Sequence, residues 1–494
     1  MTPTVSSRVS SGVPGFDVLL GGGFPAGRMY LLEGRPGTGK TTFALHFCRA
    51  AVEAGERVLY VTLSQRRDEL LAIADSHGWD LEGVDVLDVE SGGLDLHASD
   101  HTLFPAGDVD LVDLMDTVLG AVGSVRPARL VLDSAAELRL LSGDGLRSRR
   151  RFLALKHALG QRDVTTLLLD DYSASDGDSA VYSIMHGVVR LERDAPQYGQ
   201  VYRRLQIPKI RGVDHPTGYH DFRILHGGLE VYPSLTMRLK DEGADERAEA
   251  GEVGASRSSR IDGLDAMLDG GLDPGASCVV VGVSGTGKSS LAASYAVAAA
   301  EGGAPAAIYT FDERKRTLLD RMEGLGYDLR SMGDVLQVQE LSASIMTTGR
   351  FIDRVHRDVE AGVRLVVIDS LTGFTHACPG ADRAASQLHD LLAYLGGRGV
   401  VTLLTVPEHG LLGDATAPQI DISYVADTVL LLQHYEARGE IRKAIAVVKR
   451  RRGGHDRRVR QFVMSDDGMA VGDAITDYQG VLTGLAAFVD GTSL

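Results

Sequence analysis

The sequence predicts an α/β protein of two tandem domains, each built on a mostly parallel sheet flanked by helices. Short continuous apolar segments alternate with longer amphipathic segments along the chain, which is typical of parallel sheets covered on both faces. Residues 11–42 and 258–290 also share one pattern: a Gly-(Phe/Leu)-Asp, a glycine run, an apolar segment, and a glycine-rich stretch ending in Lys and a hydroxyl residue. The 494 residues are enough for two large domains.

The second half shows this alternation element by element. Its expected strands lie at residues 278–283, 306–311, 364–370, 400–406, 427–433 and 443–449. Its expected helices include residues 289–303 and 384–399. Short apolar strands separated by helices indicate a largely parallel sheet in each half.

The shared pattern indicates a duplicated domain. Lys40 and Lys288 occupy the same place in it and lie 248 residues apart, close to half the chain. This interval is too long for the period of a solenoid, so it marks a second copy of one domain. Residues 239–259 are charged and rich in small side chains, which predicts a linker. The sequence therefore predicts domains at residues 1–245 and 246–494.

Two glycine-rich segments, residues 34–41 and 282–289, each follow an expected strand and precede an expected helix. In this context GxxxxGK(S/T) predicts a phosphate loop, whose backbone N–H groups surround the phosphates of a nucleotide. A glycine-rich turn with an incidental lysine is the alternative, but two matching occurrences argue against it. The expected ATP contacts are Gly34, Gly37, Thr38, Gly39, Lys40, Thr41, Thr42, Gly282, Gly285, Thr286, Gly287, Lys288, Ser289 and Ser290.

The same motif predicts a magnesium site in each half. The loop lysine neutralises the β- and γ-phosphates, while the hydroxyl residue after it ligates Mg²⁺ together with an Asp at the end of an apolar strand. The chain has two such strands, RLVLD and RLVVID. An Asp that caps the next helix is the alternative for either strand alone. The expected Mg²⁺ ligands are Thr41, Asp133, Ser289 and Asp369.

Hydrolysis also needs a carboxylate that orients or deprotonates the attacking nucleophile. In the second half, Asp312 and Glu313 follow the second strand and are the expected catalytic carboxylates, acting with Lys288. The matching residues of the first half are Ser64 and Gln65, neither of which can act as a base. The first domain is therefore expected to bind ATP and to hydrolyse it weakly.

These motifs together resemble the KaiC family, the double-domain RecA-superfamily ATPases of bacterial and archaeal clock systems. The resemblance covers nearly the whole chain, from the GLD-x-x-L-x-GG lead-in to the K-x-RG segment near the end of each repeat. It implies two RecA-like P-loop domains and a homohexamer with ATP between adjacent subunits. It also implies that cations from one subunit contact a neighbour's γ-phosphate and stabilise its charge during transfer. These cations are Lys209, Arg211, Lys449 and Arg451.

The resemblance further implies a phosphorylation site. In the KaiC family the second domain phosphorylates an adjacent Ser-Thr pair of the neighbouring subunit, and the matching residues here are Ser423 and Tyr424. Asp312, one methylene shorter than the glutamate usual in the family, would activate Ser423. The equally weighted alternative is that both are ordinary residues at the start of a strand. The implied activity is a Ser/Thr autokinase, related to signalling or a clock, with an unidentified signalling partner.

Composition and charge weigh against several other classes. Lys plus Arg number 51 and Asp plus Glu number 67, so the net charge of −16 opposes a DNA-dependent RecA-type motor, the first alternative function. A non-catalytic, nucleotide-gated scaffold is the second alternative. The cysteine and histidine spacings predict no zinc site, and no apolar run is long enough for a membrane helix. Because no secretory signal is visible, we expect a cytoplasmic protein.

Overall fold

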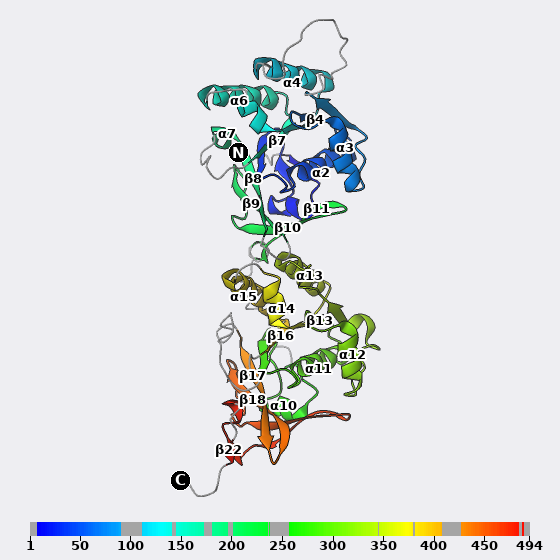
Figure 1. Cartoon of the computed structure of the whole chain (residues 1–494), viewed down its shortest axis with the longest axis vertical. Coiled ribbons are helices and arrows are strands. Elements are labelled where there is room, and N and C mark those ends of the chain that lie inside the picture. The colour runs from blue at the N-terminus through cyan, green and yellow to red at the C-terminus, as the bar shows by residue number, and fades with distance from the viewer. Residues whose placement is uncertain are drawn as a thin grey trace, which may run out of the picture. The chain divides into compact units, whose positions relative to one another are not determined.

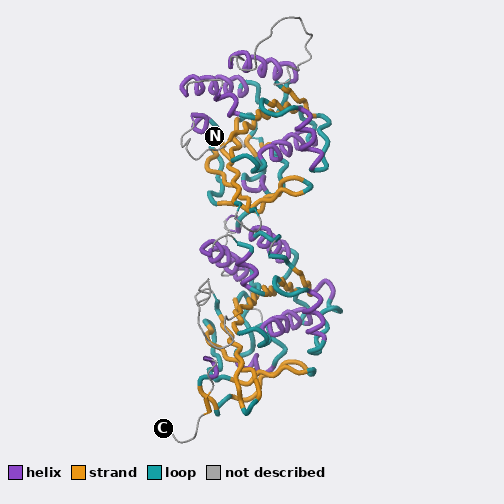
Figure 2. Tube along the Cα trace, viewed as in Figure 1, coloured by secondary structure: helices purple, strands orange, loops and turns teal. Residues whose placement is uncertain are grey.

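The computed structural model divides the chain into two units, Met1–Met237 and Arg238–Leu494, which run from blue to green and from green to red in Figure 1. Each unit contains one nine-stranded sheet with helices beside it (Figure 2). The predicted boundary between residues 245 and 246 lies outside the described residues. The structure describes residues 7–89, 111–140, 145–171, 180–195, 201–235, 237, 256–343, 345–378, 381–407, 426–483 and 487–488.

The first sheet is mostly parallel, as predicted. Its order is β5-β4-β6-β7-β3-β8-β9-β10-β11, in which the strands from β5 to β8 are parallel and the last three are antiparallel. Strands β3, β4 and β6 are buried along their whole length, as expected for strands packed on both faces. The bounds are β3 Met29–Gly34, β4 Val58–Thr62, β5 Val84–Asp88, β6 Arg129–Asp133, β7 Thr165–Asp171, β8 Gly187–Asp194, β9 Tyr202–Ile210, β10 Tyr219–Leu225 and β11 Gly228–Tyr232.

Helices cover both faces of the first sheet. Tyr30 and Leu32 of β3 pack in one core with α2 and α3, whereas Leu31 packs in a second core with α4 and α6. This alternation follows from the two-residue period of a strand. The helices are α1 Phe16–Leu19, α2 Lys40–Glu53, α3 Arg67–Ser76, α4 Leu111–Val125, α5 Ala135–Leu140, α6 Gly145–Gly160 and α7 Ala180–Ile184.

The second unit repeats this topology strand for strand. Its order is β14-β13-β15-β16-β12-β17-β18-β19-β20, with the same change from parallel to antiparallel pairing after β17. The strands are β12 Ser277–Gly282, β13 Ala306–Thr310, β14 Leu336–Glu340, β15 Leu365–Asp369, β16 Val401–Pro407, β17 Thr428–Ala437, β18 Glu440–Arg450, β19 Arg460–Ser465 and β20 Gly468–Ala474. The helices are α10 Asp262–Met267, α11 Lys288–Glu301, α12 Lys315–Glu323, α13 Thr348–Glu360, α14 Leu371–His376 and α15 Ala381–Gly397. The six strands and two helices predicted for this half, and the α/β class, are confirmed.

The Asp of the shared lead-in fixes the chain before each sheet begins. Asp17 accepts the Ser10 hydroxyl at Oδ2 (2.6 Å) and the Ser11 backbone N–H at Oδ1 (2.9 Å). Asp265 makes the same two contacts in the second unit, at 2.5 and 2.8 Å. The lead-in was predicted only as a repeat marker, and the structure gives this Asp a local structural role in each unit.

Replacing Asp17 by alanine should destabilise the first unit by roughly 1–3 kcal/mol, because two hydrogen bonds to a charged group are lost. Trp79, the single tryptophan of the chain, lies in this unit, so urea unfolding followed by its fluorescence reports the change. Asp265→Ala is the matched control, since the same contacts are then lost in the other unit. Equal shifts of the Trp79 transition in both variants would contradict the assignment.

Candidate nucleotide-binding sites

Each phosphate loop is a tight turn between a central strand and a helix. β3 ends at Gly34 and α2 begins at Lys40, and β12 and α11 repeat this arrangement. Gly37 has a φ of +76°, and the glycines directly before the helices, Gly39 and Gly287, have φ of +107° and +105°. Such left-handed backbone favours glycine. The first N–H groups of each helix and its positive end are therefore next to the loop.

At two loop glycines, Gly34 and Gly287, there is no space for a side chain. A Cβ at Gly34 would lie 2.6 Å from Thr38 Oγ1 and 2.7 Å from the Leu191 carbonyl oxygen. A Cβ at Gly287 would lie 2.5 Å from Met464 Sδ. The packing around each loop therefore requires glycine at these positions, and phosphate is the anion that glycine-rich loops of this kind bind. These features fit the nucleotide expected from the sequence.

The hydroxyl residues of the loops have two kinds of surroundings. Thr38 and Thr286 are buried, and each donates its hydroxyl to a carbonyl oxygen within its own loop at 2.9 Å. Thr41 and Ser289 lie in the first turn of α2 and α11 and are half-buried. Only the second pair is therefore positioned as candidate metal ligands, as the motif predicts.

Each loop lysine donates to a carbonyl oxygen of its own loop. Lys40 Nζ lies 2.8 Å from the Gly34 carbonyl oxygen and 2.8 Å from Asp171 Oδ1, at the end of β7. Lys288 Nζ lies 2.8 Å from the Val283 carbonyl oxygen. In strand register, Pro407 is the residue of the second unit that matches Asp171. Asp171 was not predicted, although an acidic residue directly after an apolar strand was the available signal.

The strand-end aspartates are buried at the carboxyl edge of each sheet. Asp133 accepts the Tyr60 hydroxyl at 2.7 Å, and Asp369 accepts the Thr405 hydroxyl. Burial raises the pKa of the Asp133 carboxyl, while the Tyr60 hydrogen bond and the charge of Lys40 act in the opposite direction. Carboxylate and hydroxyl oxygens are donors that Mg²⁺ accepts, so the side chains present fit the predicted metal sites.

The turn that carries the predicted carboxylates is the same in both units. The Thr62 hydroxyl donates to the Gln65 carbonyl oxygen at 2.6 Å and accepts the Gln65 N–H at 3.1 Å. Thr310 makes the same two bonds with Glu313. The structure therefore aligns Gln65 with Glu313, which agrees with the sequence comparison.

The two carboxylates of the second unit have different surroundings. Asp312 is exposed, and its Oδ2 accepts the Ser370 hydroxyl. Both oxygens of Glu313 are held by the Arg321 guanidinium, with Nη2 and Oε2 2.9 Å apart. Arg321 Nε also donates to Ser290 Oγ at 3.0 Å. Arg321 was not predicted, because a single arginine on an amphipathic helix gives no signal in the sequence.

The predicted lysines near the end of each repeat lie away from their own phosphate loop. Lys209 pairs with Val188, which pairs with Leu31, three residues before Gly34. Lys449 pairs with Val429, which pairs with Val279, three residues before Gly282. At about 3.3 Å per strand residue, both lie roughly 10 Å back from the loop, toward the opposite edge of the sheet.

The two arginines lie at that opposite edge as well. Arg211 follows the end of β9, and its Nη2 donates to the Ser183 carbonyl oxygen at 3.1 Å. Arg451 follows the end of β18, and its Nη1 lies 3.6 Å from Asp427 Oδ1. Within one subunit, the structure therefore does not bring the Lys/Arg pairs together with the phosphate loops.

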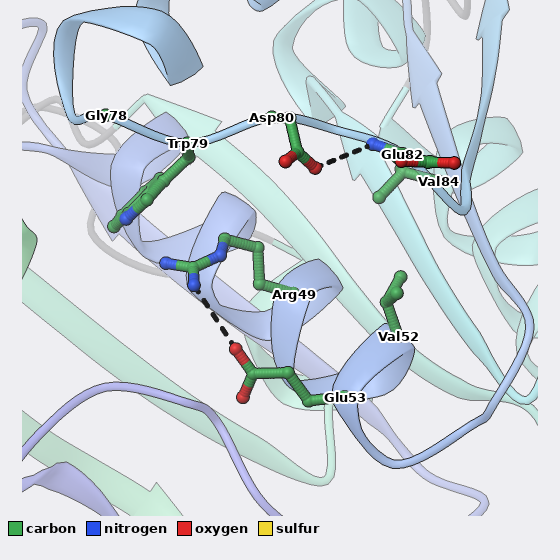
Figure 3. Close-up of a pocket in the computed structure, with 8 residues that line it drawn as sticks. All are labelled: Arg49, Val52, Glu53, Gly78, Trp79, Asp80, Glu82 and Val84. Carbon is green, nitrogen blue, oxygen red and sulfur yellow. Dashed lines mark hydrogen bonds and ion pairs between the residues drawn. The ribbon is translucent and has the colours of Figure 1, made fainter.

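A separate pocket lies at the far end of α2. Figure 3 shows Arg49 and Glu53, whose ion pair is 3.2 Å long, with Trp79 beside them. The Arg49 guanidinium lies 4.8 Å from the centre of the Trp79 ring, and the pocket volume is about 200 Å³. Arg49 is nine residues beyond Lys40, about 13 Å along the helix, so this pocket is not part of the phosphate site.

The family of the chain follows from comparison with known proteins. A family model described as "ATPase: KaiC" matches residues 9–236 and 258–475. The chain belongs to the KaiC ATPase family. It is 26% identical over 486 residues to the "Circadian clock oscillator protein KaiC" of Acaryochloris marina, covering 97% of this chain and 91% of the relative.

Further KaiC relatives match over the same extent. The protein of that name from Synechococcus elongatus is 26% identical over 491 residues, with 97% of this chain and 91% of the relative covered. The "Circadian clock protein KaiC3" of Synechocystis sp. is 26% identical over 488 residues, with 97% and 94% covered. The family match spans both phosphate loops, which confirms the predicted resemblance.

Among the residues that the structure describes, none of the helices combines the length and the apolar character that a membrane span requires. In the same part of the chain, no group of three or more His, Cys, Asp or Glu side chains lies close enough together to hold a metal ion. The KaiC-type magnesium sites expected here would instead combine one hydroxyl, one carboxylate and nucleotide oxygens.

Acidification should destabilise the first unit through His46, which lies on the helix that begins at Lys40. His46 Nε2 accepts the Leu229 N–H at 2.8 Å, and burial, followed by the charge of Arg49, lowers its pKa from 6.5 to about 4. Between about pH 6.5 and pH 4 the unfolded chain binds the proton and the folded chain does not, so stability falls as the pH falls through this range. The expected loss between pH 7 and pH 5 is about 2 kcal/mol.

Trp79 fluorescence measures this loss directly, because its ring lies 4.6 Å from the His46 ring. Urea unfolding at pH 7 and pH 5 should show a smaller pH dependence in His46→Gln, whose amide oxygen accepts the same N–H without titrating. An unchanged pH dependence in His46→Gln would contradict the assignment.

Proposed function

We propose that the protein is an ATPase whose second unit hydrolyses ATP between adjacent subunits of a homohexamer. The observation that supports a shared site is the separation of each Lys/Arg pair from its own phosphate loop. A cation must come within hydrogen-bond reach of the γ-phosphate to stabilise it. Lys449 and Arg451 would therefore serve the loop of a neighbouring copy. The number six is what the family resemblance implies.

The proposed reaction in the second unit is the in-line attack of water on the γ-phosphorus. The loop and Lys288 hold the β- and γ-phosphates. Asp312 accepts a proton from the water, the new P–O bond forms, and the bond to the ADP oxygen breaks. Lys449 and Arg451 of a neighbouring copy stabilise the charge on the transferring group. The exposed position of Asp312 supports this role, since a base must reach the nucleophile.

Magnesium belongs to the same proposal. Thr41 with Asp133, and Ser289 with Asp369, would hold the ion in the first and second unit. When bound, Mg²⁺ supplies positive charge to the phosphate oxygens.

The first unit is proposed to bind ATP and to hydrolyse it weakly. Its loop has the same backbone as the second, and Lys209 and Arg211 would contact a neighbour's γ-phosphate. Ser64 and Gln65 replace the two carboxylates, so neither of the two matching positions supplies a base. ATP bound there would mainly hold the subunits together.

A Ser/Thr autokinase activity is the finer part of the proposal. Asp312 would take the hydroxyl proton of Ser423 in a neighbouring copy, the Ser423 oxygen would bond to the γ-phosphorus, and ADP would leave. The support is the resemblance together with the exposed Asp312. Ser423 and Tyr424 lie outside the described residues.

The two loop lysines give the first test of the proposed function. Lys288→Ala should lower ATP turnover by about 100-fold or more, because the transferring phosphate loses a fixed cation. Lys40→Ala should chiefly weaken the assembly of subunits. Phosphate release and sedimentation in the presence of ATP measure the two effects. If Lys40→Ala removed most of the turnover, the assignment of the weakly hydrolysing unit would be wrong.

Phosphosite mapping tests the kinase part. After incubation with ATP and Mg²⁺, mass spectrometry should find phosphate on Ser423. Asp312→Asn should lose it, since the asparagine amide cannot accept the proton. Ser423→Ala separates this site from Tyr424. The absence of phosphate from both residues in the wild-type protein would exclude the autokinase.

A further inference from the structure

The residue after each candidate magnesium ligand contacts a basic side chain, and the two units use different ones. In the first unit, Thr42 Oγ1 lies 3.3 Å from His77 Nε2. In the second unit, Ser290 Oγ accepts Arg321 Nε at 3.0 Å. Arg321 aligns with Ile73 of the first unit, 248 residues earlier, so its contacts are specific to the second.

Arg321 joins the start of α11 to the carboxylate turn. Its guanidinium has three N–H directions in use: Nε toward Ser290, and Nη1 and Nη2 toward the two oxygens of Glu313. The side chains are 35% exposed for Arg321 and 19% exposed for Glu313. A bidentate guanidinium–carboxylate pair that is partly removed from water is held more firmly than an exposed ion pair.

This pairing separates the roles of the two neighbouring carboxylates. Each Glu313 oxygen is already an acceptor for Arg321. Asp312 uses Oδ2 to accept the Ser370 hydroxyl, and its Oδ1 has no hydrogen-bond partner among the residues that the structure describes. A general base needs a lone pair within reach of the nucleophile's proton. Asp312 offers one without breaking an ion pair, and Glu313 does not.

We propose that Arg321 is a positioning residue of the second site: it fixes Glu313 in a bidentate ion pair tied to Ser290, so that Asp312 alone acts as the base. The proposal rests on ATP hydrolysis by the second unit. Glu313 then contributes through Arg321, by keeping the turn that carries Asp312 in place against α11. The first unit, with Gln65 and Ile73 at these two positions, has no such ion pair.

Steady-state ATP hydrolysis by the full-length protein tests this division of roles, with the turnover of Lys288→Ala subtracted as the background. The variants are Asp312→Asn, Glu313→Gln, Arg321→Gln, the double variant of the last two, and Arg321→Lys. Arg330→Gln is the matched control, because Arg330 binds Asp320 and Glu323 of the same helix at its exposed side.

Asp312→Asn should lower kcat by about 10²- to 10⁴-fold, the usual range for a general base. Glu313→Gln and Arg321→Gln should each lower kcat by roughly 3- to 30-fold with little change in KM, and the double variant should be no slower than the slower single variant, as for residues that act as a unit. Arg321→Lys should recover only part of the loss, because an ammonium cannot form two parallel bonds. Arg330→Gln should match the wild type.

The variants separate failure of the Arg321 proposal from failure of the proposed function. A loss in Glu313→Gln as large as that in Asp312→Asn would make Glu313 a base, and an Arg321→Gln rate equal to that of Arg330→Gln would leave Arg321 without a role. Wild-type turnover equal to that of Lys288→Ala would refute the proposed function, and the Arg321 proposal with it. Loss of turnover in Lys288→Ala without loss in Arg321→Gln would refute the Arg321 proposal alone.

Discussion

The parallel pairing of β3 with β7, and of β12 with β16, is the constraint on which both sites depend. Parallel strands end at the same edge of a sheet, so each phosphate loop, its strand-end aspartate and the carboxylate turn meet there without being close in sequence. The antiparallel strands then return the chain, and they place the Lys/Arg pairs at the other edge. The topology of the sheet therefore places the phosphate loop at one edge and the Lys/Arg pair of the same subunit at the other.

The sequence was sufficient for the elements whose signal is local. Continuous apolar strands, the glycines of both loops and the apolar strands that end at Asp133 and Asp369 have patterns that do not depend on distant residues. The antiparallel strands β9–β11, β19 and β20 were not predicted, because their exposed faces give mixed patterns. Asp171 and Arg321 were missed for a different reason: their roles depend on contacts with Lys40 and with Glu313 and Ser290, which only the fold brings together.

The two units show how a duplicated backbone can hold different chemistry. The Thr–carboxylate turn is the same in both, down to the two hydrogen bonds of Thr62 and Thr310. The side chains that project from it differ, with Gln65 in one unit and an Arg321-bound Glu313 in the other. The backbone geometry of the turn is therefore the same in both units, although the side chains that it carries differ.

The ion pair between Lys40 and Asp171 lowers the free energy that the first unit gains when it binds a nucleotide. Since the ammonium already has an anionic partner 2.8 Å away, a phosphate that reaches Lys40 replaces one counter-ion by another. The released Asp171 carboxylate, about half-exposed, then returns to water. The gain in free energy is the difference between the Lys40–phosphate pair and the Lys40–Asp171 pair, and not the full attraction of the first. The Asp171 carboxylate therefore competes with the phosphate for Lys40. The affinity of this loop for a nucleotide depends on the ion pair that Lys40 loses as well as on the phosphate contact that it forms.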